Sequence, residues 1–383
     1  MPNSLGHCQV FDGWNVIGEH ESDDNFTERS LAKHLSIFRL DVSYLKAILL
    51  DSRGKASHRN VPVPKLQKGD ILVEMRVCGL CGSDIEKLQG RYKGVPPILG
   101  HEAAGIVAKA NNVKGIEEGE RIFPHHHVPC YKCYSCKSGS PTMCQDYRRV
   151  HYDPGGFAEN FRFLRWNIEH GGLLKLPKDM SFEEASFIEP TACCIRALNR
   201  YETKRNATAI VIGLGPIGLT FIQLLNIIGA KTYASDLSKV RLNAAKKFGA
   251  IKTFNPSEVD VAKEIKEITE GRGADIAIIA SSSSKAIVQG FNCTRRGGKV
   301  GLFGVPSKGS ILDYDFSDLF NAEKSIISSN AATEEETRTA LNYIHKKKID
   351  VNSLITHKFK LEDFEKAVDV ASKAESVKVL ITN

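Results

Sequence analysis

Four cysteines lie within one short stretch of the chain in the spacing C-x2-C-x2-C-x7-C: Cys130, Cys133, Cys136 and Cys144. Four thiolates on one loop can complete a tetrahedral shell around zinc, and a closed shell leaves no position for a substrate. The pattern therefore predicts a structural zinc site. An iron–sulfur cluster is permitted by the same ligand chemistry. Free surface thiols would invite oxidation, and a zinc-ribbon nucleic-acid module usually divides its ligands into two separated pairs.

A second set of candidate metal ligands is spread over more of the sequence. The segments VCGLCGSDIE at 77–86 and GHEAAG at 100–105 supply Cys81, His101 and Glu102, and Glu189 follows in the segment FIEP. Mixed sulfur, nitrogen and oxygen ligands that leave one position open are typical of catalytic zinc. Each residue alone is a weak indication, because a single histidine is more often structural.

A glycine-rich segment, AIVIGLGPIG at 209–218, contains the pattern G-x-G-x-x-G in Gly213, Gly215 and Gly218. A β-branched strand precedes it, and Pro216 and Ile217 open a helix. The first glycine permits a tight turn, the second lets a pyrophosphate approach the backbone, and the third lets helix and strand pack closely. The helix N-terminus then offers free N–H groups to the phosphates. The alternative is a structural turn without a nucleotide.

The end of the next strand carries Asp236. A carboxylate at this place accepts hydrogen bonds from the adenosine ribose and repels a 2′-phosphate, which favours NAD over NADP. Lys239 and Arg241 lie nearby and weaken this preference, and Arg241 is itself a candidate cofactor-binding residue.

The elements that must position these residues change in type near Ser181. Before it, short β-rich runs separated by Gly and Pro indicate a β-rich domain with long loops, with strands at 45–50, 70–77 and 103–110. Ser181 followed by Glu184 predicts a helix N-terminus, and Pro190 is expected to begin a second helix in the same run.

Beyond that helical run, strand and helix signals alternate. Strands are expected at 209–215, 231–236, 274–280, 299–305 and 325–330, and helices at 216–229, 238–248, 258–270 and 284–296. This alternation predicts an α/β fold with a doubly wound parallel sheet. A further helix follows at about 332, and the tail is expected to pack back on the first domain.

Composition limits the function further. A chain of 383 residues exceeds a single core and predicts two domains. No apolar run is long enough to span a bilayer, and no apolar signal core begins the sequence, so neither a membrane nor export is expected. A net charge of +7 without a dense basic run argues against nucleic acid. Ten cysteines in short spacings indicate metal rather than disulfides, and a reducing cytoplasm.

Taken together and in this order, the motifs over about residues 44–383 resemble the zinc-containing medium-chain alcohol dehydrogenases. The motifs are GLCGSD, GHEAAG, the four-cysteine loop, GGFAEN at 155–160, IEP, GLGPIG and SD at 235–236. The resemblance implies a β-rich GroES-like catalytic domain at 44–188 and 332–383, and a Rossmann coenzyme domain at 189–331. Residues 1–43 are then an N-terminal extension of uncertain role.

The resemblance also implies roles for single residues. Cys81 and His101 would be ligands of the catalytic zinc, Glu102 a ligand or one that exchanges with water, and Glu189 the fourth ligand. Glu rather than Cys at 189 is similar to the sorbitol and threonine dehydrogenase branch. Ser83 matches the hydroxyl that passes on the substrate proton, and Asp84 matches a partner of the zinc site. Glu86 stands where a histidine often ends the proton relay, and is either the terminal base or a solvated residue.

Three consecutive histidines, His125 to His127, precede the four-cysteine loop, where the family borders its substrate pocket. Strand alternation would point His126 away from the other two. Either these are partly exposed structural histidines, or His126 lines the pocket and selects a polar or carboxylate-bearing substrate.

The implied reaction is reversible hydride transfer between an alcohol carbon and NAD, with one catalytic and one structural zinc per subunit. The substrate would be a polyol, a secondary alcohol or an amino alcohol, with reduction of a short semialdehyde to a hydroxy acid as the alternative. A homotetramer is favoured over a dimer. The rivals are a zinc-free quinone or enoyl reductase, a non-catalytic NAD- and zinc-binding structural or regulatory protein, and a zinc-ribbon nucleic-acid binder.

Overall fold

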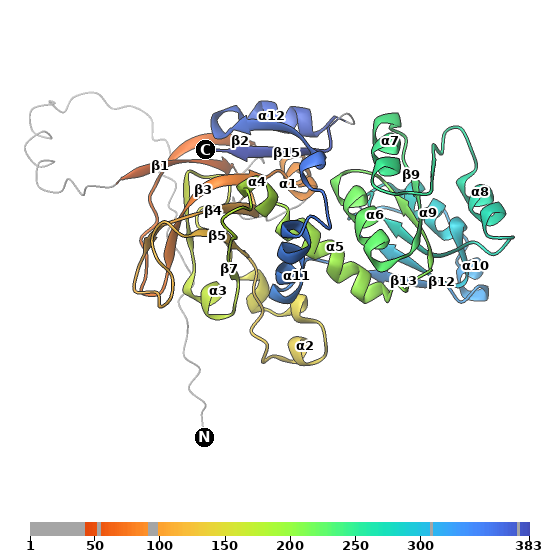
Figure 1. Cartoon of the computed structure of the whole chain (residues 1–383), viewed down its shortest axis with the longest axis horizontal. Coiled ribbons are helices and arrows are strands. Elements are labelled where there is room, and N and C mark those ends of the chain that lie inside the picture. Colours follow the sequence, from red (N-terminus) through yellow and green to blue (C-terminus); the bar gives the residue numbers. More distant parts are fainter. Residues whose placement is uncertain (1–42, 52–54, 91–98, 307–308, 374–375) are drawn as a thin grey trace, which may run out of the picture. The chain divides into compact units, whose positions relative to one another are not determined.

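The computed structural model describes residues 43–51, 55–90, 99–306, 309–373 and 376–383. Of the expected N-terminal extension, residues 1–42 lie outside this range. The described residues form one compact unit, Ser43–Asn383. It contains a seven-stranded sheet, a six-stranded sheet and a two-stranded hairpin (Figure 1). The expected pairing of a β-rich GroES-like fold with a doubly wound coenzyme-binding fold is confirmed.

The seven-stranded sheet has the order β14-β15-β3-β4-β5-β7, with β6 paired to β3. The strands of this sheet and of the hairpin are β1 (Tyr44–Leu50), β2 (Ala56–Pro62), β3 (Ile71–Gly79), β4 (Glu102–Ala110), β5 (Arg121–Pro124), β6 (Asn160–Phe163), β7 (Leu173–Lys175), β14 (Ile355–Lys360) and β15 (Lys378–Thr382). In β3, alternate residues such as Ile71, Val73 and Met75 are fully buried, so the period of two in the sequence places the core on one face.

The last two strands come from the far end of the sequence. Strand β15 pairs antiparallel with β3 and parallel with β14, so the tail completes the first sheet, as expected. In Figure 1 this strand lies beside the first strands of the chain.

The six-stranded sheet is parallel throughout, in the order β10-β9-β8-β11-β12-β13. Its strands are β8 (Thr208–Ile212), β9 (Lys231–Ser235), β10 (Lys252–Phe254), β11 (Ala274–Ile279), β12 (Thr294–Leu302) and β13 (Ser325–Ser328). From β8 the chain adds β9 and β10 on one side, and then returns to add β11, β12 and β13 on the other side. The strand order therefore reverses between β8 and β11. Ligands bind at the carboxyl ends of parallel strands at such a point.

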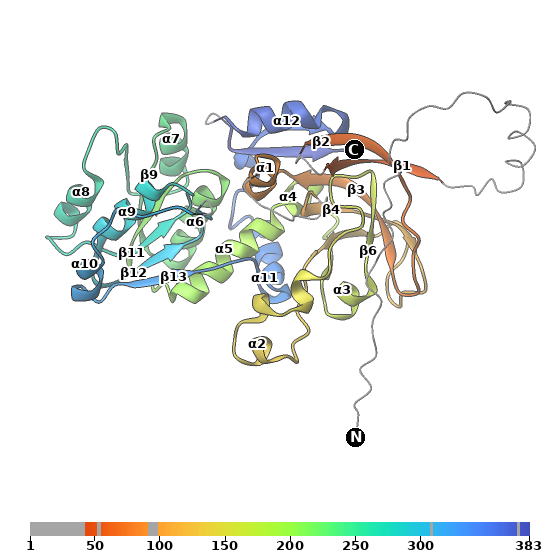
Figure 2. The same cartoon turned by 180° about the vertical axis from the view of Figure 1, so that it is seen from behind.

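The helices near the six-stranded sheet are α6 (Pro216–Ile228), α7 (Lys239–Lys247), α8 (Val261–Ile268), α9 (Ser284–Cys293) and α10 (Phe316–Asn321). The others are α1 (Gly82–Leu88), α2 (Tyr134–Lys137), α3 (Arg165–Glu169), α4 (Phe182–Ala185), α5 (Ile188–Tyr201), α11 (Glu334–His345) and α12 (Phe364–Ala371). Helix α5 packs on both α6 and α11, and Figure 2 shows it between the two sheets. No helix among the described residues has the length and apolar character of a membrane span.

Several element boundaries differ from the sequence expectation. The capping box of Ser181 and Glu184 is present, but the second helix, α5, begins at Ile188 rather than at Pro190. Helix α9 ends at Cys293 instead of 296, because Thr294 has an extended backbone and starts β12. The short elements β2, β10 and α10 were not expected.

Candidate metal and cofactor sites

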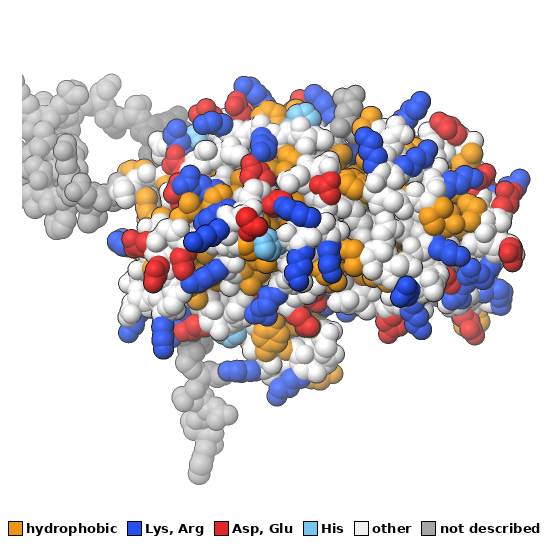
Figure 3. Space-filling model, in the orientation of Figure 1, with side chains coloured by type: hydrophobic (Ala, Val, Ile, Leu, Met, Phe, Trp, Pro, Cys, Tyr) orange, Lys and Arg blue, Asp and Glu red, His pale blue; other side chains and the backbone are white. Residues whose placement is uncertain are grey.

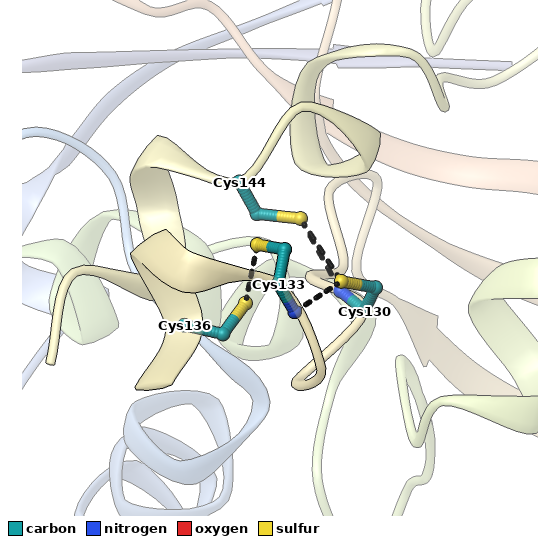
Figure 4. Close-up of side chains that lie close together, drawn as sticks. All are labelled: Cys130, Cys133, Cys136 and Cys144. Atoms are coloured by element: carbon teal, nitrogen blue, oxygen red, sulfur yellow. Dashed lines mark hydrogen bonds between the residues drawn. The ribbon is translucent and has the colours of Figure 1, made fainter. Parts of the chain in front are cut away.

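The four cysteines of the loop converge on one point, as Figure 4 shows. The Cys130 and Cys144 sulfurs are 3.5 Å apart, and so are those of Cys133 and Cys136. All four sulfurs lie within 4.8 Å of one another, and all are free thiols. A zinc–sulfur bond of about 2.3 Å gives a tetrahedron with edges of about 3.8 Å, so the group has the size of a tetrahedral thiolate site.

Hydrogen bonds attach this loop to α5 and to the segment just before α11. Arg196 of α5 donates to the Thr142 hydroxyl at 3.0 Å, and the Tyr147 hydroxyl donates to the Ala332 carbonyl at 2.5 Å. The loop is therefore held against the segment that leads into α11.

The second group forms where β3 and β4 pair antiparallel. The register places Gly79 opposite Glu102, so Cys81, just past the end of β3, lies beside His101, just before the start of β4. The ligand atoms of Cys81, His101 and Glu102 lie within 4.8 Å of one another. One pair of strands thus joins two motifs that are separate in the sequence, and the group offers sulfur, nitrogen and oxygen.

Asp84 supports this group from behind. It is fully buried in α1, and its carboxylate accepts backbone hydrogen bonds from Cys81 at 3.3 Å and Gly100 at 3.4 Å. Its Oδ1 lies 3.6 Å from His101 Nδ1. Burial alone would raise the pKa of Asp84, but His101 and Lys87 hold this pKa below its ordinary value. A histidine that faces a carboxylate through Nδ1 keeps Nε2 for a metal.

Glu102 has a partner that the motifs did not indicate. The Lys378 ammonium of β15 forms an ion pair with the Glu102 carboxylate, and both side chains are buried. Burial would lower the pKa of Lys378, yet the charge of Glu102 raises it above its usual value. The pairing was missed because only the β15–β3 contact brings these distant residues together.

Glu189 lies outside the group of three. It is buried in the first turn of α5, and its Oε1 accepts a hydrogen bond from the Cys193 thiol at 3.3 Å. Burial, together with the charge of Glu102, raises its pKa. The structure therefore brings together three of the four expected ligands. Ser83 and Glu86 both lie on α1 and are half-buried.

The histidines before the four-cysteine loop form a cluster. Strand β5 ends at Pro124, so strand alternation does not separate them, and the His126 and His127 ring centroids lie only 4.0 Å apart. The expectation of opposite faces is therefore wrong. The His126 ring also lies 5.3 Å from that of His101 and 5.9 Å from that of His151. His125 and His126 are buried rather than partly exposed.

Burial lowers the pKa of three rings in this cluster, those of His126, His127 and His151. The pKa of His126 lies well below its usual value, first because the ring is buried and second because of the charge of His127. Burial, followed by the charges of Lys87 and His101, lowers the pKa of His151 to about 4. Neutral imidazoles each carry one donor and one acceptor, which suits uncharged hydroxyl groups.

The glycine turn has the geometry that its pattern predicted. Gly213 has a φ of +91°, and a Cβ on Gly218 would lie 1.9 Å from the Gly213 carbonyl oxygen. A Cβ on Gly215, in contrast, would meet no atom of the described residues within 4 Å. Gly215 is the N-cap of α6, and it has no side chain that could cap the helix. Pro216 and Ile217 are the first two residues of α6. The turn therefore leaves a cradle open at the helix N-terminus.

Asp236 closes the other side of this turn. Its two carboxylate oxygens accept backbone hydrogen bonds from Leu214 at 2.7 Å and Ser238 at 2.8 Å. The carboxylate is thus fixed beside the glycine turn. Arg241 donates to the Ser376 carbonyl at 2.9 Å, so its guanidinium connects α7 to the segment before β15.

Comparison with known proteins gives two family matches and several related sequences. The profile of the alcohol dehydrogenase GroES-like domain matches residues 67–177, and that of the zinc-binding dehydrogenase matches residues 216–346. Sorbitol dehydrogenase of Bacillus subtilis is 30% identical over 349 residues, which are 88% of this chain and 97% of that protein. L-Threonine 3-dehydrogenase of Pyrococcus furiosus is 32% identical over 331 residues, 84% of this chain and 93% of that protein.

Solved structures show the same arrangement. A zinc-binding dehydrogenase from Sinorhizobium meliloti 1021 bound to NADP has a TM-score of 0.81 and 29% identity, and covers 89% of this chain and 100% of its own. A short chain alcohol dehydrogenase from E. coli CFT073 complexed with NADH has a TM-score of 0.77 and 26% identity, with coverage of 89% and 100%.

Proposed function

The chain belongs to the zinc-containing medium-chain alcohol dehydrogenase family, and we propose that it exchanges hydride between NAD and a small polar alcohol. The substrate would be a polyol, a secondary alcohol or an amino alcohol. The observation that carries the proposal is the group Cys81, His101 and Glu102, built on paired strands with Asp84 behind His101. A non-catalytic protein has no need of such an arrangement.

We further propose two zinc ions per subunit. Cys81 and His101 would be ligands of the catalytic ion, Glu102 a ligand or one that exchanges with water, and Glu189 the fourth ligand. The loop of Cys130, Cys133, Cys136 and Cys144 would hold the structural ion, because four thiolates leave no open position.

When they are bound, zinc supplies a Lewis acid for the substrate oxygen and the nicotinamide ring accepts hydride from the alcohol carbon. The residues of the chain orient these partners and move the proton. Asp84 fixes the ring of His101 through Nδ1. The Ser83 hydroxyl, on the same helix, would receive the substrate proton and pass it to Glu86 or to solvent. The open turn at Gly215 would take the pyrophosphate.

The two sheets would correspond to two domains. We assign residues 44–188 and 332–383 to the catalytic domain and residues 189–331 to the NAD-binding domain, after an extension of residues 1–43. A cytoplasmic location fits the cysteines, since all nine that are described are free. The face drawn in Figure 3 mixes basic with acidic side chains, and we propose no nucleic-acid partner.

Self-association is proposed through the edge of the six-stranded sheet. Strand β13 is the last strand of that sheet, and Ile326 on it is exposed together with Phe316 and Phe320 of the neighbouring α10. Exposed apolar side chains beside an unpaired strand edge favour a second copy. A tetramer is favoured over a dimer, and sedimentation velocity distinguishes the two.

Cofactor choice is tested at Asp236. Asp236→Asn removes the charge that would repel a 2′-phosphate while keeping one acceptor oxygen for the turn. The ratio of kcat/KM with NAD to that with NADP should fall about 10-fold, which is about 1.4 kcal/mol. Asp260→Asn is the matched control, because it changes an exposed carboxylate that caps a different helix, α8. An unchanged ratio would show that Asp236 does not select the cofactor.

Substrate choice is tested at His126. His126→Phe removes a neutral hydrogen-bonding ring near His101 and adds an apolar one. The kcat/KM for a polyol relative to that for a plain aliphatic alcohol of similar length should fall at least about 10-fold. His170→Phe, on a ring that stacks on Trp166, is the control. Equal ratios in the wild type and the His126 variant would remove His126 from the pocket.

The proposed function itself is tested by initial rates of zinc-loaded protein with NAD(H) and NADP(H). The panel contains polyols, amino alcohols, simple alcohols and short semialdehydes. Turnover of one alcohol class supports the proposal and names the class. Turnover only of semialdehydes selects the reductase alternative. No turnover, with zinc and NAD bound, favours a structural or regulatory protein.

A further inference from the structure

Tyr131 connects the four-cysteine loop to a buried carboxylate. It lies between Cys130 and Cys133, in a left-handed backbone conformation with a φ of +57°. Its hydroxyl donates a hydrogen bond to Glu334 Oε2, at the first residue of α11. An ionised carboxylate oxygen only accepts hydrogen bonds, so the phenol is the donor of this bond.

The other oxygen of Glu334 faces a histidine. Its Oε1 lies 3.6 Å from His125 Nδ1, and the side chains of His125 and Glu334 are 1% and 2% exposed. Among the residues that the structure describes, neither ring nitrogen of His125 has a hydrogen-bond partner, and Glu334 Oε1 has none either. Burying an unpaired carboxylate costs several kcal/mol of folding free energy. The Tyr131 hydroxyl, the His125 ring and the N-terminus of α11 therefore hold the Glu334 carboxylate in its position.

His125 is continuous with the candidate substrate pocket. The Asn167 amide donates to the carbonyls of both His125 and His126 at 3.0 Å, and the His125 N–H donates to Gly172 at 2.6 Å. The backbone here is thus fixed. The His125 ring packs edge-on against His126 at 5.6 Å, and His126 lies next to His101. A shift of the His125 ring would therefore reach the ring beside the candidate metal ligand.

We propose that Glu334 is a positioning residue that couples the four-cysteine loop to the substrate pocket, through Tyr131 on one side and His125 on the other. The loop then has a second role besides local stability, because its shape sets the position of His126. This inference rests on the proposed function. It assigns no contact between Glu334 and the substrate.

The first test compares two substitutions in the same helical turn. Glu334→Gln keeps the size and an acceptor for Tyr131, but removes the charge that faces His125. The alcohol KM should rise about 10-fold, with less than about a threefold change in kcat and in the KM for NAD. Glu335→Gln, at an exposed position of the same turn, should change none of them. Equal alcohol KM values for the two variants would overturn the inference.

The second test is a double-mutant cycle. Tyr131→Phe should raise the alcohol KM in the wild type, and should add nothing in a Glu334→Ala background, because Tyr131 acts only through Glu334. Additive effects would contradict the coupling, since a merely structural contribution of each residue would be independent of the other.

A spectroscopic readout separates this inference from the proposed function. With Co²⁺ in the Cys81 site and zinc kept in the loop, Glu334→Gln and Tyr131→Phe should shift the visible cobalt bands, whereas Glu335→Gln should not. Unshifted bands in both variants would overturn the coupling even if alcohols are turned over. If no alcohol in the panel is turned over, the proposed function fails, and the cobalt bands alone decide the coupling.

Discussion

Replacement of Cys81 by Ser should abolish turnover while cofactor binding survives. Serine stays a neutral hydroxyl near pH 7 and is a poor zinc ligand, so the group keeps only His101 and Glu102. Because Lewis-acid stabilisation of the substrate oxygen is worth several kcal/mol, kcat should fall at least about 1,000-fold. Rates are measured together with zinc content, which should drop by one ion per chain, and with NADH fluorescence titration.

Cys293→Ala is the matched control for this variant. Cys293 is also a buried free cysteine, but it packs in a hydrophobic cluster of the six-stranded sheet. The Cys293→Ala protein should keep its zinc content and most of its activity. A Cys81→Ser protein with full zinc content and wild-type kcat would refute the assignment of this group as the catalytic site.

Two glycines of the same turn should respond in opposite ways to a single methyl group. In Gly215→Ala the added Cβ meets nothing within 4 Å in the described part of the chain, and the φ of −65° is ordinary for alanine. The fold should keep its Tm within about 2 °C, because no contact is disturbed. The KM for NAD should rise at least about 10-fold, since the methyl occupies the approach of the pyrophosphate.

Gly218→Ala should instead damage the fold. Its Cβ would lie 1.9 Å from the Gly213 carbonyl oxygen, and a backbone atom cannot move aside as a flexible side chain does. Separating α6 from β8 should cost about 3 kcal/mol or more, which lowers the Tm by several degrees. Thermal unfolding and NAD kinetics of both variants decide the matter. A stable Gly218→Ala protein, or a Gly215→Ala protein with normal NAD kinetics, would contradict the assigned roles.

Local patterns predicted those parts of the molecule whose chemistry is local. The turn at 213–218 is specified by adjacent residues, because the positive φ at Gly213 and the close contact at Gly218 arise within one strand–turn–helix unit. The four-cysteine loop is similar, since its ligand atoms belong to one short segment. Spacing alone is sufficient for such features.

Features that depend on distant residues were not predictable in this way. The partner of Glu102 is Lys378, 276 positions away, and the partner of Tyr131 is Glu334, 203 positions away. No spacing rule connects them, because only the sheet order and the packing of α11 bring them together. The histidines were misassigned for a related reason: the strand β5 ends before His125, and boundaries are the least certain part of a sequence pattern.

The late strand β15 also sets an order of events on the ribosome. Strands β3 and β4 emerge early, yet the buried carboxylate of Glu102 meets its ammonium partner only after 276 more residues have been joined. The whole six-stranded sheet, from β8 to β13, is translated in the interval. Because chain elongation adds roughly 5–20 residues per second, this wait is on the order of 10 s to 1 min. Until then Glu102 lacks its Lys378 partner, and the candidate catalytic site is finished after the six-stranded sheet has been synthesised.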